Sequence, residues 1–243
     1  MAQQGEVIVL SPHLDDAALD CADHILAWKK LGLSVRVVTL FAKSTSPSPE
    51  SVTFDPSTDL ERRRIHEDRE VMSRLGVSWN HLSFADGRSR QENGKPHRES
   101  EQLQRGTSKD PIVAALTKAI VPFQKGSLFV APLGIGGHVD HLLVREAAEF
   151  ETDPADLCYY VDYPYALSVL NWTCTNMLRV MRAKKSIKVM SRAKRQLLGI
   201  YSSQIPQIFS HTRFSMPWIT WNLVRVYPEI VVYGKRTRLG TQK

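Results

Sequence analysis

Residues Glu6–Asp23, EVIVLSPHLDDAALDCAD, combine a short apolar run, a polar turn and an apolar pattern of helical spacing. The run Val7–Leu10 is rich in β-branched residues and too short for a helix, so it predicts a buried strand. Ser11–Pro12 ends this run, and apolar residues then recur at helical spacing from Ala17 onward. A strand, a tight turn and a helix form the opening unit of an α/β fold, whose ligands bind at the carboxyl ends of the strands.

The turn between the predicted strand and helix carries the chemistry. It contains no glycine, which argues against a nucleotide-phosphate loop of the G-x-G-x-x-G kind. It contains His13, Asp15 and Asp16, and an imidazole and two carboxylates at a strand's end suit a divalent metal ion with a base beside it. A second polar cluster, His138–His141, follows the apolar run Leu128–Ala131 and precedes another helical pattern, so the arrangement repeats.

These two clusters carry a family resemblance. PHLDD at residues 12–16 and GGHVDH at residues 136–141 resemble the P-H-x-D-D and H-x-D-H motifs of the PIG-L/LmbE-like zinc-dependent de-N-acetylases, in the expected order. The resemblance extends over most of the chain, from Glu6 to Gln204. It implies a hydrolase that removes an N-acetyl or N-acyl group from an amino-sugar (GlcNAc-type) conjugate.

The resemblance also implies a set of metal ligands and a general base. His13, Asp16 and His141 match the family's zinc ligands, although another divalent metal ion is compatible with them. Asp15 is then left beside the activated water as the general base. Many family members have glutamate after the second aspartate, whereas this chain has Ala17, a difference that bears on the support of the ligands and on substrate range.

The second cluster is expected to supply the remaining catalytic groups. In the family the histidine at the position of His138 binds no metal, but stabilises the tetrahedral oxyanion or acts as an acid. It lies three residues before His141, so on a helical turn both face the same way. Asp140 is expected to orient one of these two imidazoles.

Two further residues match substrate-binding positions of the family. Arg64 lies in the amphipathic pattern Asp59–Leu75, and the resemblance implies that it reaches the substrate pocket; an exposed ion pair on the helix surface is the alternative. Asp86, in a segment that resembles the family's F-P-D-G loop, is placed to accept hydrogen bonds from sugar hydroxyls. A turn aspartate before a glycine is equally natural there.

Strands and helices alternate as far as Phe150, which predicts an α/β fold that is Rossmann-like, with a mostly parallel sheet and helices on both faces. We expect one domain over residues 1–243, with the loops Lys43–Pro56 and Arg88–Thr107 setting the substrate. The further predicted strands and helices are Ser34–Ala42, Trp79–Phe84, Asp110–Phe123, Leu142–Phe150, Leu157–Val161 and Glu229–Tyr233.

Composition fits a soluble globular protein: of 243 residues, 42% are hydrophobic and 23% charged. No apolar run approaches the length of a membrane-spanning helix, and the polar start MAQQGE does not predict a signal peptide. Three widely spaced cysteines, an odd number, argue against a disulfide framework. These features predict a cytoplasmic protein with reduced thiols.

The net charge of +7 is concentrated in one stretch, because Arg179–Arg195 holds eight basic residues and no acidic one. This stretch is either an anion-binding surface for nucleic acid, membrane or a phosphorylated substrate, or a solvated helical face with apolar residues between the charges. We favour the solvated face, because a basic face alone specifies little.

Three hypotheses on function follow. The first is the zinc amidohydrolase, with a small-molecule amino-sugar conjugate as its partner and neither a nucleic-acid partner nor a membrane span. The second is a non-catalytic anion- or nucleic-acid-binding protein that uses residues 179–195, which leaves both His/Asp clusters unexplained. The third is an inactive relative that only binds sugars. The sequence leaves the conjugate, the acyl group and the oligomeric state open.

Overall fold

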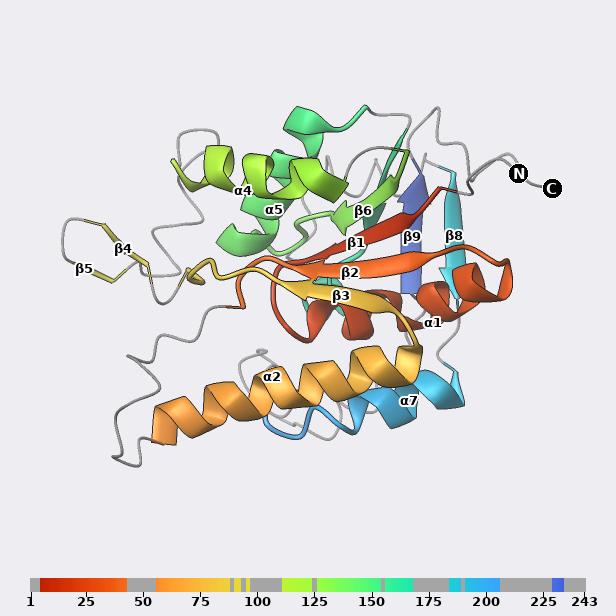
Figure 1. Ribbon diagram of the computed structural model, residues 1–243, viewed down its shortest axis with the longest axis horizontal. Helices are drawn as coiled ribbons and strands as arrows, with labels where there is room; N and C mark the ends of the chain where they lie inside the picture. The colour runs from red at the N-terminus through yellow and green to blue at the C-terminus, as the bar shows by residue number, and fades with distance from the viewer. Residues whose placement is uncertain are drawn as a thin grey trace.

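A seven-stranded sheet in the order β3-β2-β1-β6-β7-β9-β8 forms the centre of the computed structural model (Figure 1). Its strands are β1 (Val7–Ser11), β2 (Val35–Thr39), β3 (Ser78–His81), β6 (Leu128–Pro132), β7 (Leu157–Tyr160), β8 (Lys185–Lys188) and β9 (Glu229–Tyr233). The structure describes residues 5–42, 56–87, 90–92, 95–96, 111–123, 126–153, 156–167, 184–188, 191–205 and 229–233.

The five strands from β3 to β7 run parallel, and β9 and β8 pair antiparallel to their neighbours. Val7 of β1 lies opposite Val35 on one side and Leu128 on the other. Every residue of β1 is buried, as its unbroken apolar run predicts for a central parallel strand. The predicted strands Val7–Leu10 and Leu128–Ala131 are therefore neighbours in one sheet.

Helices cover both faces of the sheet (Figure 1). Helices α4 and α5 lie on one face, and α1, α2 and α7 lie on the other. Gly32 and Gly76, at the ends of α1 and α2, have φ angles of 79° and 64°, a left-handed conformation that glycine adopts without a Cβ penalty. The helices are α1 (Asp16–Lys30), α2 (Pro56–Leu75), α4 (Ile112–Ile120), α5 (Val139–Glu151) and α7 (Arg192–Leu198), with short 3₁₀ turns η2 (Val121–Phe123) and η4 (Tyr165–Leu167).

The α/β prediction is confirmed, but two predicted loops contain little described structure. Within Arg88–Thr107, Gln91–Glu92 (β4) and Lys95–Pro96 (β5) form a separate two-stranded sheet. Residues 43–55 and 97–110 lie outside the described residues, and so does Asp110, the first residue of the predicted element Asp110–Phe123. The prediction of one domain over residues 1–243 stays a prediction.

The prediction of a solvated helical face in the basic stretch is wrong for part of it, although Arg192 and Arg195 do lie exposed on α7. Lys185–Lys188 is strand β8, in which exposed and half-buried residues alternate along an edge of the sheet. Lys194, in α7, is buried and its Nζ lies 2.7 Å from Glu229 Oε1. The periodicity favoured a helix because apolar residues separate the charges, but a strand at an edge accommodates the same composition.

Glu229 joins three elements through one buried carboxylate. Besides Lys194 of α7, it accepts hydrogen bonds from the backbone N–H groups of Asp23 and His24 in α1, both at 2.9 Å. His24 Nδ1 also lies 2.9 Å from Glu229 Oε2. Paired charges and hydrogen bonds compensate the desolvation of this carboxylate, so β9 is fixed against the helices beneath it.

Two smaller expectations concern membrane spans and cysteines. Within the ranges that the structure describes, no helix combines the length and the apolar character needed to cross a membrane. Cys21 and Cys158 are buried free thiols, while Cys174 lies outside the described ranges.

Candidate active site

The carboxyl ends of five adjacent parallel strands meet at one edge of the sheet. His13 follows β1 and His138 follows β6, so the two predicted motifs are brought together by the pairing of these strands. Phe41 follows β2, Arg90 lies in the segment after β3, and Asp162 follows β7. The site is thus assembled from segments that are 150 residues apart in the chain, as expected at the carboxyl edge of an open α/β sheet.

His13, Asp16 and His141 converge on one point. Asp16 Oδ2 lies 3.1 Å from His13 Nδ1 and 3.4 Å from His141 Nε2. One nitrogen or oxygen atom from each of the three side chains lies within 4.8 Å of the others, a spacing that can hold a metal ion. Two imidazoles and a carboxylate are a ligand set that zinc accepts at catalytic centres.

A carboxylate fixes each of the two imidazoles on the side away from this point. His13 Nε2 lies 3.0 Å from Asp140 Oδ2, and His141 Nδ1 lies 2.7 Å from Asp162 Oδ1. Each pair is satisfied when the imidazole donates its proton to the carboxylate, which leaves His13 Nδ1 and His141 Nε2 as free lone pairs facing Asp16. The ring orientation therefore suits metal binding.

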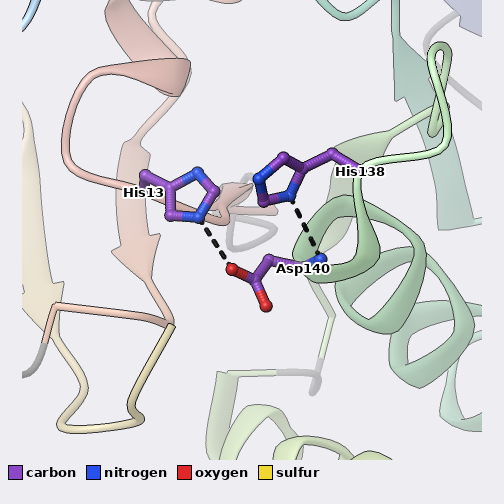
Figure 2. Close-up of side chains that lie close together, drawn as sticks. All are labelled: His13, His138 and Asp140. Atoms are coloured by element: carbon purple, nitrogen blue, oxygen red, sulfur yellow. Dashed lines mark hydrogen bonds and ion pairs between the residues drawn. The ribbon is translucent and has the colours of Figure 1, made fainter. Parts of the chain in front are cut away.

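Asp140 does not have the partner predicted from the sequence. Its carboxylate orients His13, whereas only its backbone N–H reaches His138, at 3.3 Å from Nδ1 (Figure 2). Gly87 N donates to the same Oδ2 at 2.8 Å, and Arg90 Nη1 lies 2.8 Å from Oδ1. Asp140 and His138 could also join His13 in a second donor set of suitable spacing. The engagement of Asp140 with Gly87 and Arg90 favours the set with Asp16.

His138 presents a neutral imidazole to the site. Its Nδ1 accepts the Asp140 N–H, so the ring proton resides on Nε2. Burial is the largest cause that lowers the pKa of His138, to about 3, and His13 and His141 lower it further when their rings are protonated. The His138 ring centroid lies 5.1 Å from that of His13 and 5.2 Å from that of His141. A neutral ring with a free Nε2–H is a hydrogen-bond donor suited to a developing oxyanion.

Asp15 is buried beside the three possible ligands. It occupies the N-cap position of α1, but its side chain makes no capping hydrogen bond. Burial and then the Asp16 charge raise the pKa of Asp15 to about 7, while His13 and Arg64 act in the opposite direction. The role of Arg64 in substrate binding stays a prediction.

The helix that carries Arg64 is held by its neighbour Glu67. Glu67 accepts hydrogen bonds from Ser203 N at 3.0 Å and from Ser203 Oγ at 2.6 Å, and Ser202 Oγ lies 3.0 Å away. Residues 202–204 are the Ser-Ser-Gln segment that follows α7. Glu67 therefore fixes α2 to this segment, and the position of Arg64 follows from that contact.

Asp86 lies at the rim of the site. Its side chain is half-buried, and its backbone oxygen accepts from Arg90 N at 3.0 Å. The next residue, Gly87, donates to Asp140, so the predicted sugar-binding loop contacts the second cluster directly.

Sequence reasoning gave no site role to three residues that lie at the site, although Asp162–Tyr165 resembles the family's acidic-aromatic-proline loop at a strand's end. Asp162 orients His141, Arg90 pairs with Asp140, and the Tyr165 ring lies 6.0 Å from His138 and 5.7 Å from His141. Asp162 follows a strand that ends beside β6, and that position was the available signal. For Arg90 no signal was present, because its segment is polar throughout.

Comparison with known proteins gives consistent relatives. A 2'-N-acetylparomamine deacetylase of Streptomyces fradiae is 28% identical over 170 residues, which cover 68% of this chain and 59% of that protein. The protein of the same description from Niallia circulans is 26% identical over 182 residues, covering 64% and 66%. The chain thus spans about three-fifths to two-thirds of the length of these two relatives.

A solved structure has the same fold. The zinc inhibited form of teicoplanin deacetylase Orf2 superposes with a TM-score of 0.69 at 21% identity, covering 96% of this chain and 100% of that one. The sequence model of the PIG-L family, described as GlcNAc-PI de-N-acetylase, matches residues 8–150, which include both His/Asp clusters. This chain belongs to the PIG-L family.

Proposed function

We propose that this protein is a metal-dependent hydrolase that removes the N-acetyl group from an amino-sugar conjugate. The observation that carries the proposal is the convergence of His13, Asp16 and His141 on one point, with Asp15 buried beside them. The deacetylase relatives support the reaction and the amino-sugar substrate class.

His13, Asp16 and His141 would hold the metal ion, with His13 and His141 kept in the binding tautomer by Asp140 and Asp162. We propose zinc for this site, since the donor set suits it. When bound, zinc supplies a Lewis acid that polarises a carbonyl and activates water near neutral pH.

The remaining steps belong to residues of this chain. Asp15 takes a proton from the attacking water while the water oxygen forms its bond to the amide carbon. The His138 Nε2–H donates a hydrogen bond to the oxyanion that develops from the carbonyl oxygen. When the C–N bond breaks, the same proton passes from Asp15 to the amine, which leaves as the free amino sugar, and acetate is the other product.

Arg64 and Asp86 are proposed to bind the sugar. Arg64 lies close enough to Asp15 to influence it electrostatically, and the Asp86 loop contacts Asp140 through Gly87. Both therefore flank the reacting groups, where they can donate to and accept from hydroxyl groups.

Direct measurement of amine release tests the proposal. Metal-free protein is incubated with N-acetylglucosamine conjugates and with 2'-N-acetylparomamine, and zinc, manganese or cobalt is added at increasing concentrations. We expect turnover with a stoichiometric metal ion. The range of metal concentrations extends above one equivalent, because the solved Orf2 structure is that of a zinc inhibited form.

Two variants provide the controls for this experiment. His13→Ala and His141→Ala remove one ligand each, so both are expected to lose bound metal and amine release together. Retention of the metal by both variants would contradict the assignment of His13 and His141 as ligands. A wild-type protein that binds metal but releases amine from none of these substrates would overturn the proposed reaction.

The alternative of an anion- or nucleic-acid-binding protein has less support. In the described part of the basic stretch, the Lys194 ammonium is buried against Glu229 and is not available to an external anion. The cytoplasm stays the predicted location.

A further inference from the structure

Arg90 contacts the site through the carboxylate that orients His13. Its Nη1 lies 2.8 Å from Asp140 Oδ1, and this Asp140 side chain is 1% exposed. The other oxygen, Oδ2, faces His13 Nε2 at 3.0 Å. The three side chains therefore form a chain in which the guanidinium lies on one side of the carboxylate and the imidazole on the other.

The guanidinium is itself held in place from two sides. Nη1 donates to the Ala85 carbonyl at 3.1 Å, and the guanidinium carbon lies 5.1 Å from the centre of the Phe41 ring. The backbone N–H of Arg90 donates to Asp86 O at 3.0 Å. The position of the charge is thus set by the segment after β3 and by the ring that follows β2.

The contact with Asp140 depends on charge more than on hydrogen-bond geometry. Nη1 is near Oδ1, but the two atoms form no hydrogen bond, and Nε and Nη2 are buried without a hydrogen-bond partner among the described residues. Burying N–H groups without acceptors costs free energy. A neutral side chain could fasten the Ala85 loop at lower cost, so the positive charge beside Asp140 is what distinguishes arginine at this position.

We propose that Arg90 is a positioning residue of the metal site: its charge holds the Asp140 carboxylate against His13 and thereby fixes the ring whose Nδ1 faces Asp16. This rests on the proposed function in so far as His13 is a metal ligand. Arg90 contacts neither Asp16 nor His141, so it acts on the site through Asp140. Loss of the charge is expected to leave the Asp140 carboxylate held by the Gly87 N–H without a cation beside it, which loosens the imidazole before any substrate is bound.

Arg145 offers a matched control. Like Arg90, it donates to a backbone carbonyl, that of Leu133 at 2.9 Å, and lies over an aromatic ring, that of Tyr159 at 5.6 Å. It also pairs with a carboxylate, Glu149, at 3.0 Å. That carboxylate accepts from the Tyr159 hydroxyl at 2.8 Å, so Arg145→Met removes the same kinds of contact beside a carboxylate that is paired with a tyrosine.

The experiment measures zinc affinity by competition with a chromophoric chelator, and thermal stability of the metal-free protein. Arg90→Met is expected to weaken zinc binding by about 10–100-fold, as loss of residues that orient metal ligands does, with a metal-free Tm close to that of Arg145→Met. Arg90→Lys, which restores the charge, is expected to recover most of the affinity. Should Arg90→Met fail to fold, Arg90→Gln takes its place with the same expected result.

The same Arg90 substitution in a protein that already carries Asp140→Asn shows whether Arg90 acts through Asp140. In Asp140→Asn protein, Arg90→Met is expected to change zinc affinity by less than about threefold, because the intermediary is already lost. Unchanged zinc affinity in Arg90→Met, or an equal loss in both backgrounds, would overturn the proposal. The zinc measurements use no substrate, so the two proposals can fail separately. Zinc binding without deacetylation by the wild type would refute only the proposed reaction. Deacetylation by the wild type, together with unchanged zinc affinity in Arg90→Met, would refute only the role of Arg90.

Discussion

Asp162 and His141 are joined by a hydrogen bond of 2.7 Å that links the end of β7 to the helix of the second motif. The other oxygen of Asp162 accepts from Ile135 N at 2.9 Å, so the carboxylate cannot rotate without losing a buried contact. The direction of the His141 ring is therefore set by a strand that contributes none of the three proposed ligands.

Removing this carboxylate should weaken metal binding. Asp162→Ala is expected to lower zinc affinity by about 10–100-fold, because the His141 tautomer and ring direction are no longer fixed. Asp162→Asn keeps an acceptor for only one of the two contacts, so an intermediate loss is expected. Chelator competition on the metal-free proteins checks both values, and wild-type affinity in Asp162→Ala would show that His141 needs no orienting partner.

Substitutions of Asp15 and Asp16 should have different effects on zinc binding and turnover. Asp15→Asn removes the proton acceptor and leaves the ligands intact, so zinc should remain bound while kcat falls by roughly 10²–10⁴-fold. Asp16→Asn replaces a charged ligand by a neutral one, so zinc affinity should fall first and added zinc should restore part of the activity. A zinc titration paired with amine-release kinetics separates the two, and loss of metal in Asp15→Asn with retention in Asp16→Asn would reverse the roles.

His138 has two functions that different substitutions can separate. Its Nδ1 caps α5 by accepting the Asp140 N–H, and its Nε2–H is the proposed oxyanion donor. Asparagine is a good capping residue, so His138→Asn should keep stability and zinc while kcat falls. His138→Ala should lose the same activity and, in addition, about 1 kcal/mol of unfolding free energy. Full activity in His138→Asn would exclude the oxyanion role.

Stability should fall in acid through Glu229. Burial alone would raise the pKa of this carboxyl, but Lys194 and His24 outweigh it and hold the pKa at about 2. Because this value lies below the ordinary 4.5, the contribution to stability is present above pH 4.5 and is lost as the pH falls towards 2. Its size is on the order of 3 kcal/mol.

Denaturant unfolding between pH 7 and pH 3 checks this dependence. Glu229→Gln should be less stable at pH 7, because Lys194 is left buried without its partner, and its stability should vary less with pH. Glu70→Gln, which removes an exposed i,i+4 partner of Arg74, is the control and should change little. Parallel pH curves for wild type and Glu229→Gln would contradict the assignment.

Gly136 should tolerate no side chain. Its φ is 86°, and a Cβ would lie 2.6 Å from Tyr165 Cβ, beside the ring that faces His138 and His141. Gly126 has a similar φ of 74°, but a Cβ there meets no described atom within 4 Å. Gly126→Ala should therefore cost about 1–2 kcal/mol from backbone strain, and Gly136→Ala about 1–3 kcal/mol more from the overlap. Equal losses of Tm in the two variants would show that the Tyr165 side chain moves aside at little cost in free energy.

The local elements could be predicted from the sequence because their signals are local. The run at Val7–Leu10, the helical pattern up to Gly32 and the repeat of strand, turn and cluster at His138 need only nearby residues to be recognised. The three proposed ligands come from the family resemblance, and the parallel pairing of neighbouring strands brings them to one edge of the sheet.

The partners of those residues could not be predicted, because they depend on which strands become neighbours. Asp140 contacts His13, 127 residues away in the chain, rather than the adjacent imidazoles. The buried state of Lys194 depends on Glu229, which belongs to another segment altogether. From the sequence Lys194 is one charge of a solvated face, and only the three-dimensional pairing of strands changes that description.

The insertion of β9 between β7 and β8 has a consequence during synthesis of the chain. Glu229 follows His24 by 205 residues, an interval of roughly 10–40 s at common rates of translation. Once β7 has been made, the nascent polypeptide holds both His/Asp motifs, while β7 is an open sheet edge and the backbone N–H groups of Asp23 and His24 lack the Glu229 acceptor. An unpaired sheet edge is a site for pairing with other chains, so the nascent chain is exposed to aggregation until Glu229–Tyr233 adds to the sheet.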